Sequence, residues 1–127
     1  MSSYQKYKGN MGEDAVVDFL QQKGCMILER NYFIQGGEID IIAVDDDKIR
    51  FVEVKTRKQS GISSGFEAVN NRKQKNIIRT ALKYCSCHVV DLQPCFDVAL
   101  VCMENGCVQS IDYLENAFDL SDFDSLF

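Results

Sequence analysis

Two apolar runs separated by four polar residues constrain the fold of this chain most strongly. Residues 38–44 read EIDIIAV and residues 49–57 read IRFVEVKTR, and both are rich in the β-branched side chains that favour strands. A two- or four-residue turn between them pairs Val44 with Ile49 in an antiparallel hairpin, and opposed positions then have numbers that add up to 93. A three-residue turn would shift this register by one residue.

This register predicts a cluster of ionisable side chains on one face of the hairpin. Asp40 would oppose Glu53, and Glu38 would oppose Lys55, because opposed residues share a face and side chains alternate along each strand. Two opposed carboxylates repel one another unless a cation pairs with them. Mg²⁺ accepts one or two carboxylates together with phosphate oxygens. A lysine beside it can hold the scissile phosphate or activate the attacking water. The pattern therefore indicates phosphodiester hydrolysis with Mg²⁺ or Mn²⁺, and the alternative is a surface salt-bridge cluster.

Charge is distributed unevenly along the chain. The formal net charge is −5, but residues 48–83 carry 10 basic and 2 acidic residues. Residues 1–47 carry 4 basic and 9 acidic residues, and residues 84–127 carry 8 acidic residues and no basic one. A polyanion responds to the local field within a Debye length of about 8–10 Å. The middle segment can therefore bind phosphates, unless the three segments neutralise one another within the fold.

Hydrophobic periodicity predicts two helices. The first is expected from Asn10 to Gly24, and the second from Asn70 or Asn71 to about Tyr84. Further strands are expected at residues 25–31, 88–92, 95–103 and 107–112, and a Gly- and Ser-rich loop at residues 58–65. The order, which begins α-β-β-β-α-β-β, predicts a mixed sheet with helices packed against it.

Domain organisation follows from the same reading. Residues 1–112 are expected to form one domain, because no linker and no repeat divides them. Residues 113–127 form an acidic and aromatic tail that either forms a short helix or stays loose. Packing on the core is the favoured role for this tail, ahead of binding a partner or covering the basic surface formed by residues 48–83 and so holding the protein inactive.

Glu13 admits two interpretations. It lies three residues after Asn10, where it would complete a capping box. On a helix it also lies on the same side as apolar Leu20, so it could point toward the sheet and join the acidic cluster.

The second predicted helix carries a basic stripe. Its members are spaced so that they share one helix face, and they are Arg72, Lys75, Arg79 and Lys83. Such a stripe is typical of a surface that follows a phosphate backbone, and equally of a solvated helix face.

Several classes of protein are disfavoured. No apolar run approaches the ~18 residues of a membrane-spanning helix, and no apolar segment follows the first basic residues as in a signal peptide. We therefore expect a cytoplasmic protein without a membrane partner. Its six cysteines are expected to be reduced thiols. Cys85-Ser86-Cys87-His88 has the spacing C-x-C-H and not C-x2-C, so a zinc site is the less favoured alternative there.

The two hairpin strings carry a family resemblance. GEIDIIA at residues 37–43 and FVEVKTR at residues 51–57 resemble the PD-(D/E)xK restriction-endonuclease-like superfamily. More narrowly, the chain resembles the YraN-type family of uncharacterised proteins, relatives of archaeal Holliday-junction resolvases. The similarity also includes Gly12-Glu13, Arg30-Asn31-Tyr32, and Val69 with Lys73.

The resemblance implies an α/β fold and a nuclease site. The fold would be a restriction-endonuclease-like (tRNA-endonuclease-like) αβββαβ core, with a mixed central sheet flanked by helices. Asp40 and Glu53 would be metal ligands, Lys55 the catalytic lysine and Glu13 an accessory acid.

Taken together, these expectations define a candidate site and a function. The candidate catalytic residues are Asp40, Glu53, Lys55 and Glu13, and the candidate metal ligands are Asp40, Glu53, Glu13 and Glu38. The candidate nucleic-acid-binding residues are Arg57, Lys58, Arg72, Lys73, Lys75 and Arg79. The expected function is Mg²⁺- or Mn²⁺-dependent hydrolysis of DNA, favoured over RNA, with branched or structured DNA as a candidate substrate. A nucleic-acid-binding module without hydrolysis and an acidic interaction protein are the alternatives, and a homodimer is left open.

Overall fold

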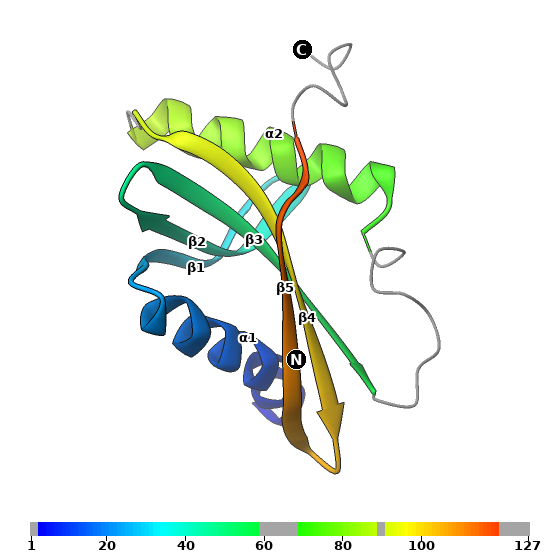
Figure 1. Ribbon diagram of the computed structural model, residues 1–127. Coiled ribbons are helices and arrows are strands. Elements are labelled where there is room, and N and C mark those ends of the chain that lie inside the picture. The colour runs from blue at the N-terminus through cyan, green and yellow to red at the C-terminus, as the bar shows by residue number, and fades with distance from the viewer. Residues whose placement is uncertain (1–2, 59–68, 89–90, 120–127) are drawn as a thin grey trace.

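The computed structural model of the chain describes residues 3–58, 69–88 and 91–119. Its elements follow the order α1-β1-β2-β3-α2-β4-β5 (Figure 1). The two helices are α1 (Ser3–Gln22) and α2 (Asn71–His88). The five strands are β1 (Met26–Ile34), β2 (Gly37–Asp45), β3 (Lys48–Lys58), β4 (Gln93–Glu104) and β5 (Cys107–Phe118).

The strands form one mixed sheet. Their spatial order is β1-β2-β3-β4-β5, and every neighbouring pair is antiparallel except β3 and β4, which are parallel. A parallel pair needs a crossover connection, and α2 lies in the connection between β3 and β4. The first six elements reproduce the predicted αβββαβ order, and the expected mixed sheet flanked by helices is confirmed.

The predicted hairpin register is confirmed. Val44 pairs with Ile49 and Ile41 pairs with Val52, and the chain turns at Asp46 and Asp47. The two-residue turn is the condition under which Asp40 comes to lie beside Glu53.

Two hydrophobic cores lie on opposite faces of the sheet. The larger core lies under α2 and includes Ile42, Phe51 and Ile78. The second core lies under α1 and includes Leu20 and Val52. Figure 1 shows the two helices on either side of the sheet. Because β2 and β3 are covered on both faces, a polar side chain that is buried on either strand needs a hydrogen-bond or ion-pair partner.

Two glycines allow the helices to approach the sheet closely. A Cβ on Gly12 would lie 2.7 Å from Oγ1 of Thr56 on β3, which is closer than real Cβ atoms come. A Cβ on Gly37 would overlap the side chain of Thr80 on α2. The close approach of α1 at Gly12 brings the next residue, Glu13, against the sheet.

Several predicted boundaries are wrong. The helix α1 begins at Ser3, so Asn10 lies inside the helix and the predicted capping box with Glu13 does not form. No strand includes His88, Asp91 or Leu92, since His88 ends α2; residues 89–90 of that predicted strand lie outside the described residues. The predicted loop at residues 58–65 falls almost wholly outside them as well.

The expected tail begins as a strand. Residues 113–118 continue β5 instead of forming a helix or a loose segment, and residues 120–127 lie outside the described part of the chain. Phe118 is buried in the core under α2 and stacks on Phe96 with ring centroids 5.4 Å apart. In the described ranges 3–58, 69–88 and 91–119, no helix is long and apolar enough to cross a membrane.

Candidate functional site

Asp40 lies where the pairing of β2 with β3 ends. The last pair toward this end of the hairpin joins Ile41 and Val52. Beyond it, Oδ2 of Asp40 accepts a hydrogen bond from the backbone N–H of Val54 at 2.8 Å, in place of a ladder carbonyl. Ile39 packs in the core under α2, whereas Ile41 packs in the core under α1, so the alternation of side chains breaks at Asp40.

The neighbouring strand is irregular at the same level. Tyr32 pairs with Ile39 and Arg30 pairs with Ile41, which puts Asn31 of β1 opposite Asp40. Asn31 has φ 53°, a left-handed conformation that asparagine tolerates better than most residues. The irregularity therefore frees Asp40 from the regular ladder and lets its carboxylate turn toward β3.

Burial and charge raise the pKa of Asp40 to about 7. Burial is the larger cause, and the negative charge of Glu53 is the next, while the hydrogen bond from Val54 acts in the opposite direction. The negative charge of Glu38 adds a smaller increase. The negative charge of Glu53 thus opposes the ionisation of Asp40, as one carboxylate does to another when no cation lies between them.

Glu53 is almost wholly buried. Its side chain is 4% exposed, and Oε1 lies 2.6 Å from Nζ of Lys73 on α2. Its other oxygen, Oε2, is buried and has no hydrogen-bond partner within the described part of the chain. Burial raises the pKa of Glu53, and the charges of Lys73 and Lys55 lower it. An unpartnered oxygen on a buried carboxylate is costly, and it is an atom that a cation could satisfy.

Lys55 lies on β3 two residues after Glu53. Its side chain is half-buried, and its positive charge acts on Glu53. No ion pair to Lys55 is found among the residues that the structure describes. Glu38, on β2, is exposed, and its charge acts on both Asp40 and Glu53. The structure therefore brings the four residues of the predicted hairpin cluster into one electrostatic group.

Glu13 lies at the edge of this group. Its carboxylate is buried, and Oε1 accepts a hydrogen bond from Nδ2 of Asn31 at 3.2 Å. Nη2 of Arg30 lies 3.5 Å from the same oxygen and 2.7 Å from Oδ1 of Asp14. Burial raises the pKa of Glu13, and the charge of Asp40 raises it further. Of the two predicted roles, the structure excludes the capping box. It places Glu13 near the acidic group, where Arg30 and Asn31 of β1 contact its carboxylate.

The donor atoms fit a hard divalent cation. Asp40 and Glu53 offer carboxylate oxygens, the ligands that Mg²⁺ prefers, and Oε2 of Glu53 has no hydrogen-bond partner among the residues that the structure describes. Among the described residues, no three Asp, Glu, His or Cys side chains converge closely enough to surround one ion. Mg²⁺ does not require such a cage, because it usually keeps several waters and takes one or two carboxylates together with substrate phosphates.

The predicted basic residues divide into two groups and one exception. Arg72, Lys75 and Arg79 are exposed on α2, whose opposite side is buried through Ile77, Ile78 and Ala81. Arg57 is half-buried and Lys58 is exposed, and both lie at the end of β3. Lys73 differs from the rest because its ammonium turns inward to Glu53. Its contact with the acidic group was not predicted, although Lys73 lies outside the basic stripe and one helical turn before the buried Ile77.

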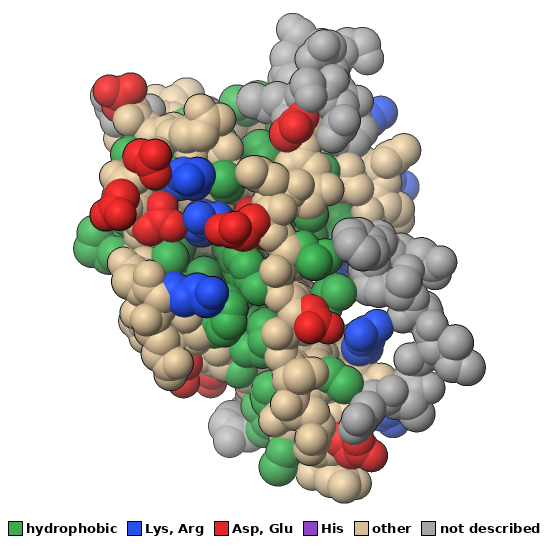
Figure 2. Space-filling model, in the orientation of Figure 1, with side chains coloured by type: hydrophobic (Ala, Val, Ile, Leu, Met, Phe, Trp, Pro, Cys, Tyr) green, Lys and Arg blue, Asp and Glu red, His purple; other side chains and the backbone are tan. Residues whose placement is uncertain are grey.

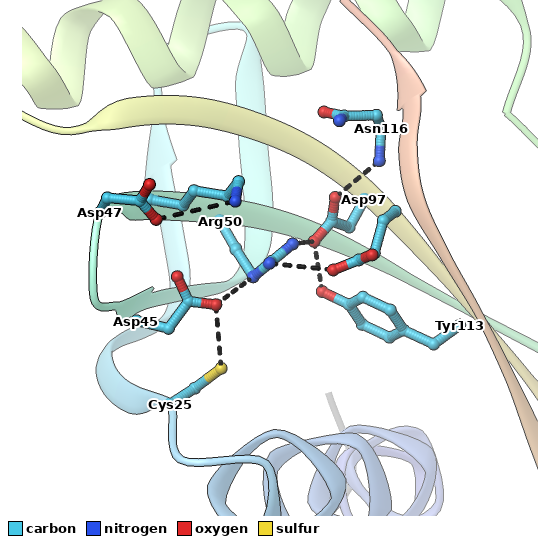
Figure 3. A network of polar contacts seen from close by, with 9 residues as sticks. Cys25, Asp45, Asp47, Arg50, Asp97, Tyr113 and Asn116 are labelled. Carbon is cyan, nitrogen blue, oxygen red and sulfur yellow. Dashed lines mark hydrogen bonds and ion pairs between the residues drawn. The ribbon is translucent and has the colours of Figure 1, made fainter.

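A second polar centre lies under α1, toward the turn of the hairpin. The guanidinium of Arg50 forms ion pairs with Asp45 at 2.8 Å, with Asp97 at 2.9 Å and with Glu115 at 2.9 Å. Figure 3 shows the guanidinium between Asp45 and Asp97, with the hydroxyl of Tyr113 directed at Asp97. Asp97 has no exposed surface and also accepts the backbone N–H of Asn116 at 3.0 Å. The network joins β2, β3, β4 and β5, and its sequence signal is the charged Asp97 inside the apolar run FDVALV.

A shallow hollow of about 400 Å³ opens beside this network. Phe19, Lys23, Cys25, Arg50 and Tyr113 are among the residues that line it. Figure 2 shows hydrophobic side chains exposed in the middle of this face, with a group of acidic and basic side chains beside them. The guanidinium of Arg50 and the carboxylate of Asp97 are already paired with each other. The acidic group around Asp40 does not line the hollow, so we assign no chemistry to it.

Comparison with known proteins identifies relatives over most of the chain. Residues 12–101 match the model of the uncharacterised protein family UPF0102. A UPF0102 protein of Acetivibrio thermocellus is 45% identical over 116 residues, which cover 87% of this chain and 89% of that protein. A UPF0102 protein of Pelobacter propionicus is 40% identical over 116 residues, which cover 89% of this chain and 83% of that protein.

Proposed function

The chain belongs to the uncharacterised family UPF0102, and we propose that it is a metal-dependent nuclease that hydrolyses phosphodiester bonds of DNA in the cytoplasm. One observation carries the proposal. A buried glutamate, Glu53, has an oxygen that no described residue contacts by a hydrogen bond, and it lies beside Asp40, whose pKa is raised to about 7. Two neighbouring carboxylates, one buried and one half-buried, destabilise a fold, and a bound cation or proton would relieve this cost.

The sequence strings support the same assignment. GEIDIIA and FVEVKTR lie on β2 and β3 of an αβββαβ core, which is the arrangement expected of the PD-(D/E)xK superfamily. Fold alone does not establish activity, so the proposal depends on the acidic group and not on the fold.

Each residue of the group has a proposed task. Asp40 and Glu53 would hold Mg²⁺ or Mn²⁺, which supplies positive charge against the charge that develops on the phosphate. The Val54 N–H fixes one oxygen of Asp40, so its other oxygen keeps a defined direction. Lys55 would hold the attacking water or a phosphate oxygen, since its ammonium has no ion pair among the described residues. Glu13, on α1, would add negative charge to the metal site, and the hydrogen bond from Asn31 orients its carboxylate.

The exposed basic face of α2 would hold the DNA backbone. Arg72, Lys75 and Arg79 are exposed there, on the helix that also carries Lys73 to Glu53. Phosphate contacts of this kind position a duplex without reading its sequence. We therefore propose recognition by the shape of the DNA, with branched or structured DNA as the leading candidate substrate.

A second function is favoured by one observation. No three acidic, histidine or cysteine side chains converge on one point in the described residues, and Lys73 already neutralises Glu53. A nucleic-acid-binding module that does not hydrolyse its ligand would also fit this arrangement.

A cleavage panel distinguishes the two functions. Linear, nicked, single-stranded and four-way-junction DNA and a structured RNA are incubated with the protein and Mg²⁺ or Mn²⁺. A nuclease cuts at least one substrate only with the metal, and the variants Glu53→Gln and Lys55→Met lose about 100-fold or more of the rate. Salt-dependent binding of DNA without cutting by any of these proteins would leave the binding module as the function.

A further inference from the structure

Lys73 is anchored at both ends. Its backbone N–H donates to Oδ1 of Asn70 at 2.9 Å, a contact that caps the start of α2. Its Nζ lies 2.6 Å from Oε1 of Glu53. The cap fixes where the side chain leaves the helix, and the ion pair fixes where the side chain ends.

The two partners of this ion pair have unequal freedom. The side chain of Glu53 is 4% exposed, whereas that of Lys73 is 41% exposed. Glu53 therefore cannot leave its place without unpacking the sheet. Lys73 has four rotatable methylene groups and an open route to solvent along the exposed side of α2.

A divalent cation on Asp40 and Glu53 would meet the ammonium of Lys73. The divalent ion and the ammonium would both bind the carboxylate of Glu53, and the charge of Lys73 acts on Asp40 as well as on Glu53. An ammonium 2.6 Å from a ligand oxygen would repel a doubly charged ion that binds the same carboxylate. The protein can relieve this conflict by moving the partner that is free to move.

We propose that Lys73 is an exchangeable counterion of the acidic site. In the metal-free protein its ammonium compensates the buried charge of Glu53. When the cation binds, the ammonium leaves Glu53, turns to the exposed side of α2 and contacts a phosphate of the DNA. Metal binding would thereby strengthen DNA binding. The inference rests on the proposed function, because it assumes a cation on Asp40 and Glu53.

The first test measures Mg²⁺ affinity by calorimetry at pH 8.5 in the wild type and in Lys73→Met. The variant keeps the length of the side chain and removes the competing ammonium, so it should bind Mg²⁺ roughly tenfold more tightly. The matched control is Lys48→Met, which removes a lysine of similar exposure from the far end of β3. The control should bind Mg²⁺ as the wild type does. Equal or weaker binding by Lys73→Met would overturn the exchange.

A measurement on the wild type covers the case in which Lys73→Met fails to fold. The ¹⁵N resonance of the Lys73 ammonium should show slow hydrogen exchange in the metal-free protein, as expected for an ammonium bonded to a buried carboxylate. Addition of Mg²⁺ should abolish this protection. If protection persists in the metal-loaded protein, Lys73 remains on Glu53 and the proposal is wrong.

The second half of the proposal concerns DNA. The salt dependence of binding to a short DNA duplex reports the number of phosphates that the protein neutralises, with a slope of about −0.9 for each. Without metal, the wild type and Lys73→Met should have the same slope. With Ca²⁺ as the bound cation, the slope of the wild type should be steeper than that of Lys73→Met by the amount that one phosphate contact contributes. Equal slopes with Ca²⁺ would overturn the phosphate contact.

The outcomes separate this inference from the proposed function. If the wild type binds no Mg²⁺ and cuts no DNA, the proposed function fails and the exchange fails with it. If the wild type binds Mg²⁺ through Asp40 and Glu53 but Lys73→Met does not bind it more tightly, only the exchange fails.

Discussion

The backbone N–H of Val54 donates to Oδ2 of Asp40 at 2.8 Å, across the gap where β2 and β3 stop pairing. This contact turns the carboxylate of Asp40 toward β3 and beside Glu53, instead of toward either core. The fold thus gives up a ladder position to bring the half-buried Asp40 beside the buried Glu53, which destabilises the fold unless a cation lies between them.

Asp40→Asn should therefore stabilise the metal-free protein. The amide oxygen still accepts the N–H of Val54, while the charge facing Glu53 is removed. We expect a gain on the order of 1–3 kcal/mol at pH 8, measured by denaturant unfolding in EDTA. Asp47→Asn, at an exposed turn position, is the control and should change stability little. A less stable Asp40→Asn would contradict the account of Asp40 as a strained acid.

The stability of the metal-free protein should depend on pH through Asp40. The unfolded chain loses this proton near pH 4, whereas the folded protein keeps it up to about pH 7. In this window the unfolded state binds fewer protons, so the free energy of unfolding falls as pH rises and levels off above about pH 7. The contribution of one proton is at most about 1.4 kcal/mol per pH unit.

The comparison of wild type with Asp40→Asn isolates this effect from other titrating groups. The two proteins should have similar stabilities near pH 4 and diverge in favour of the variant up to about pH 7. A difference that is constant from pH 4 to pH 8 would show that the pKa of Asp40 is not raised.

The network around Arg50 should govern stability and leave metal binding unchanged. Arg50→Met leaves the charge of Asp97 buried without its cation, which costs about 3–5 kcal/mol in unfolding experiments. Glu115→Gln removes a partner that is 64% exposed and should cost less than about 1 kcal/mol. The thermal shift produced by Mg²⁺ should persist in both variants. Loss of that shift in a folded Arg50→Met protein would show that the network belongs to the metal site.

Gly12→Ala should destabilise the contact between α1 and β3. The new Cβ meets Oγ1 of Thr56 at 2.7 Å, and overpacking of this kind costs about 1–3 kcal/mol. Thr56→Ala removes the obstructing oxygen, so the double variant should recover most of the lost melting temperature. If the double variant is as unstable as Gly12→Ala alone, Thr56 is not the obstruction.

The hairpin was the most predictable part of the molecule. Its apolar alternation and short polar turn set the pairing of Val44 with Ile49, and this register brings Asp40 and Glu53 together. The break of alternation at Asp40 was not predictable from local pattern, because it depends on the left-handed Asn31 of the neighbouring strand.

Helix limits and long-range polar contacts were predicted less well. Asn70 caps α2 as expected, since asparagine is a strong capping residue. Asn10 has the same local signal but lies inside α1, because the helix continues back to Ser3. The pairing of Lys73 with Glu53 and of Arg50 with Asp97 joins residues far apart in the chain, and single-sequence patterns carry no information on such contacts.

Anomalous diffraction from crystals grown with Mn²⁺ tests most directly whether Asp40 and Glu53 share a cation. We expect an anomalous peak within coordination distance of a carboxylate oxygen of Asp40 and of Oε2 of Glu53, and no peak in crystals of Glu53→Gln. Crystals of the wild type with no peak at these two carboxylates at saturating Mn²⁺ would contradict the proposed metal site.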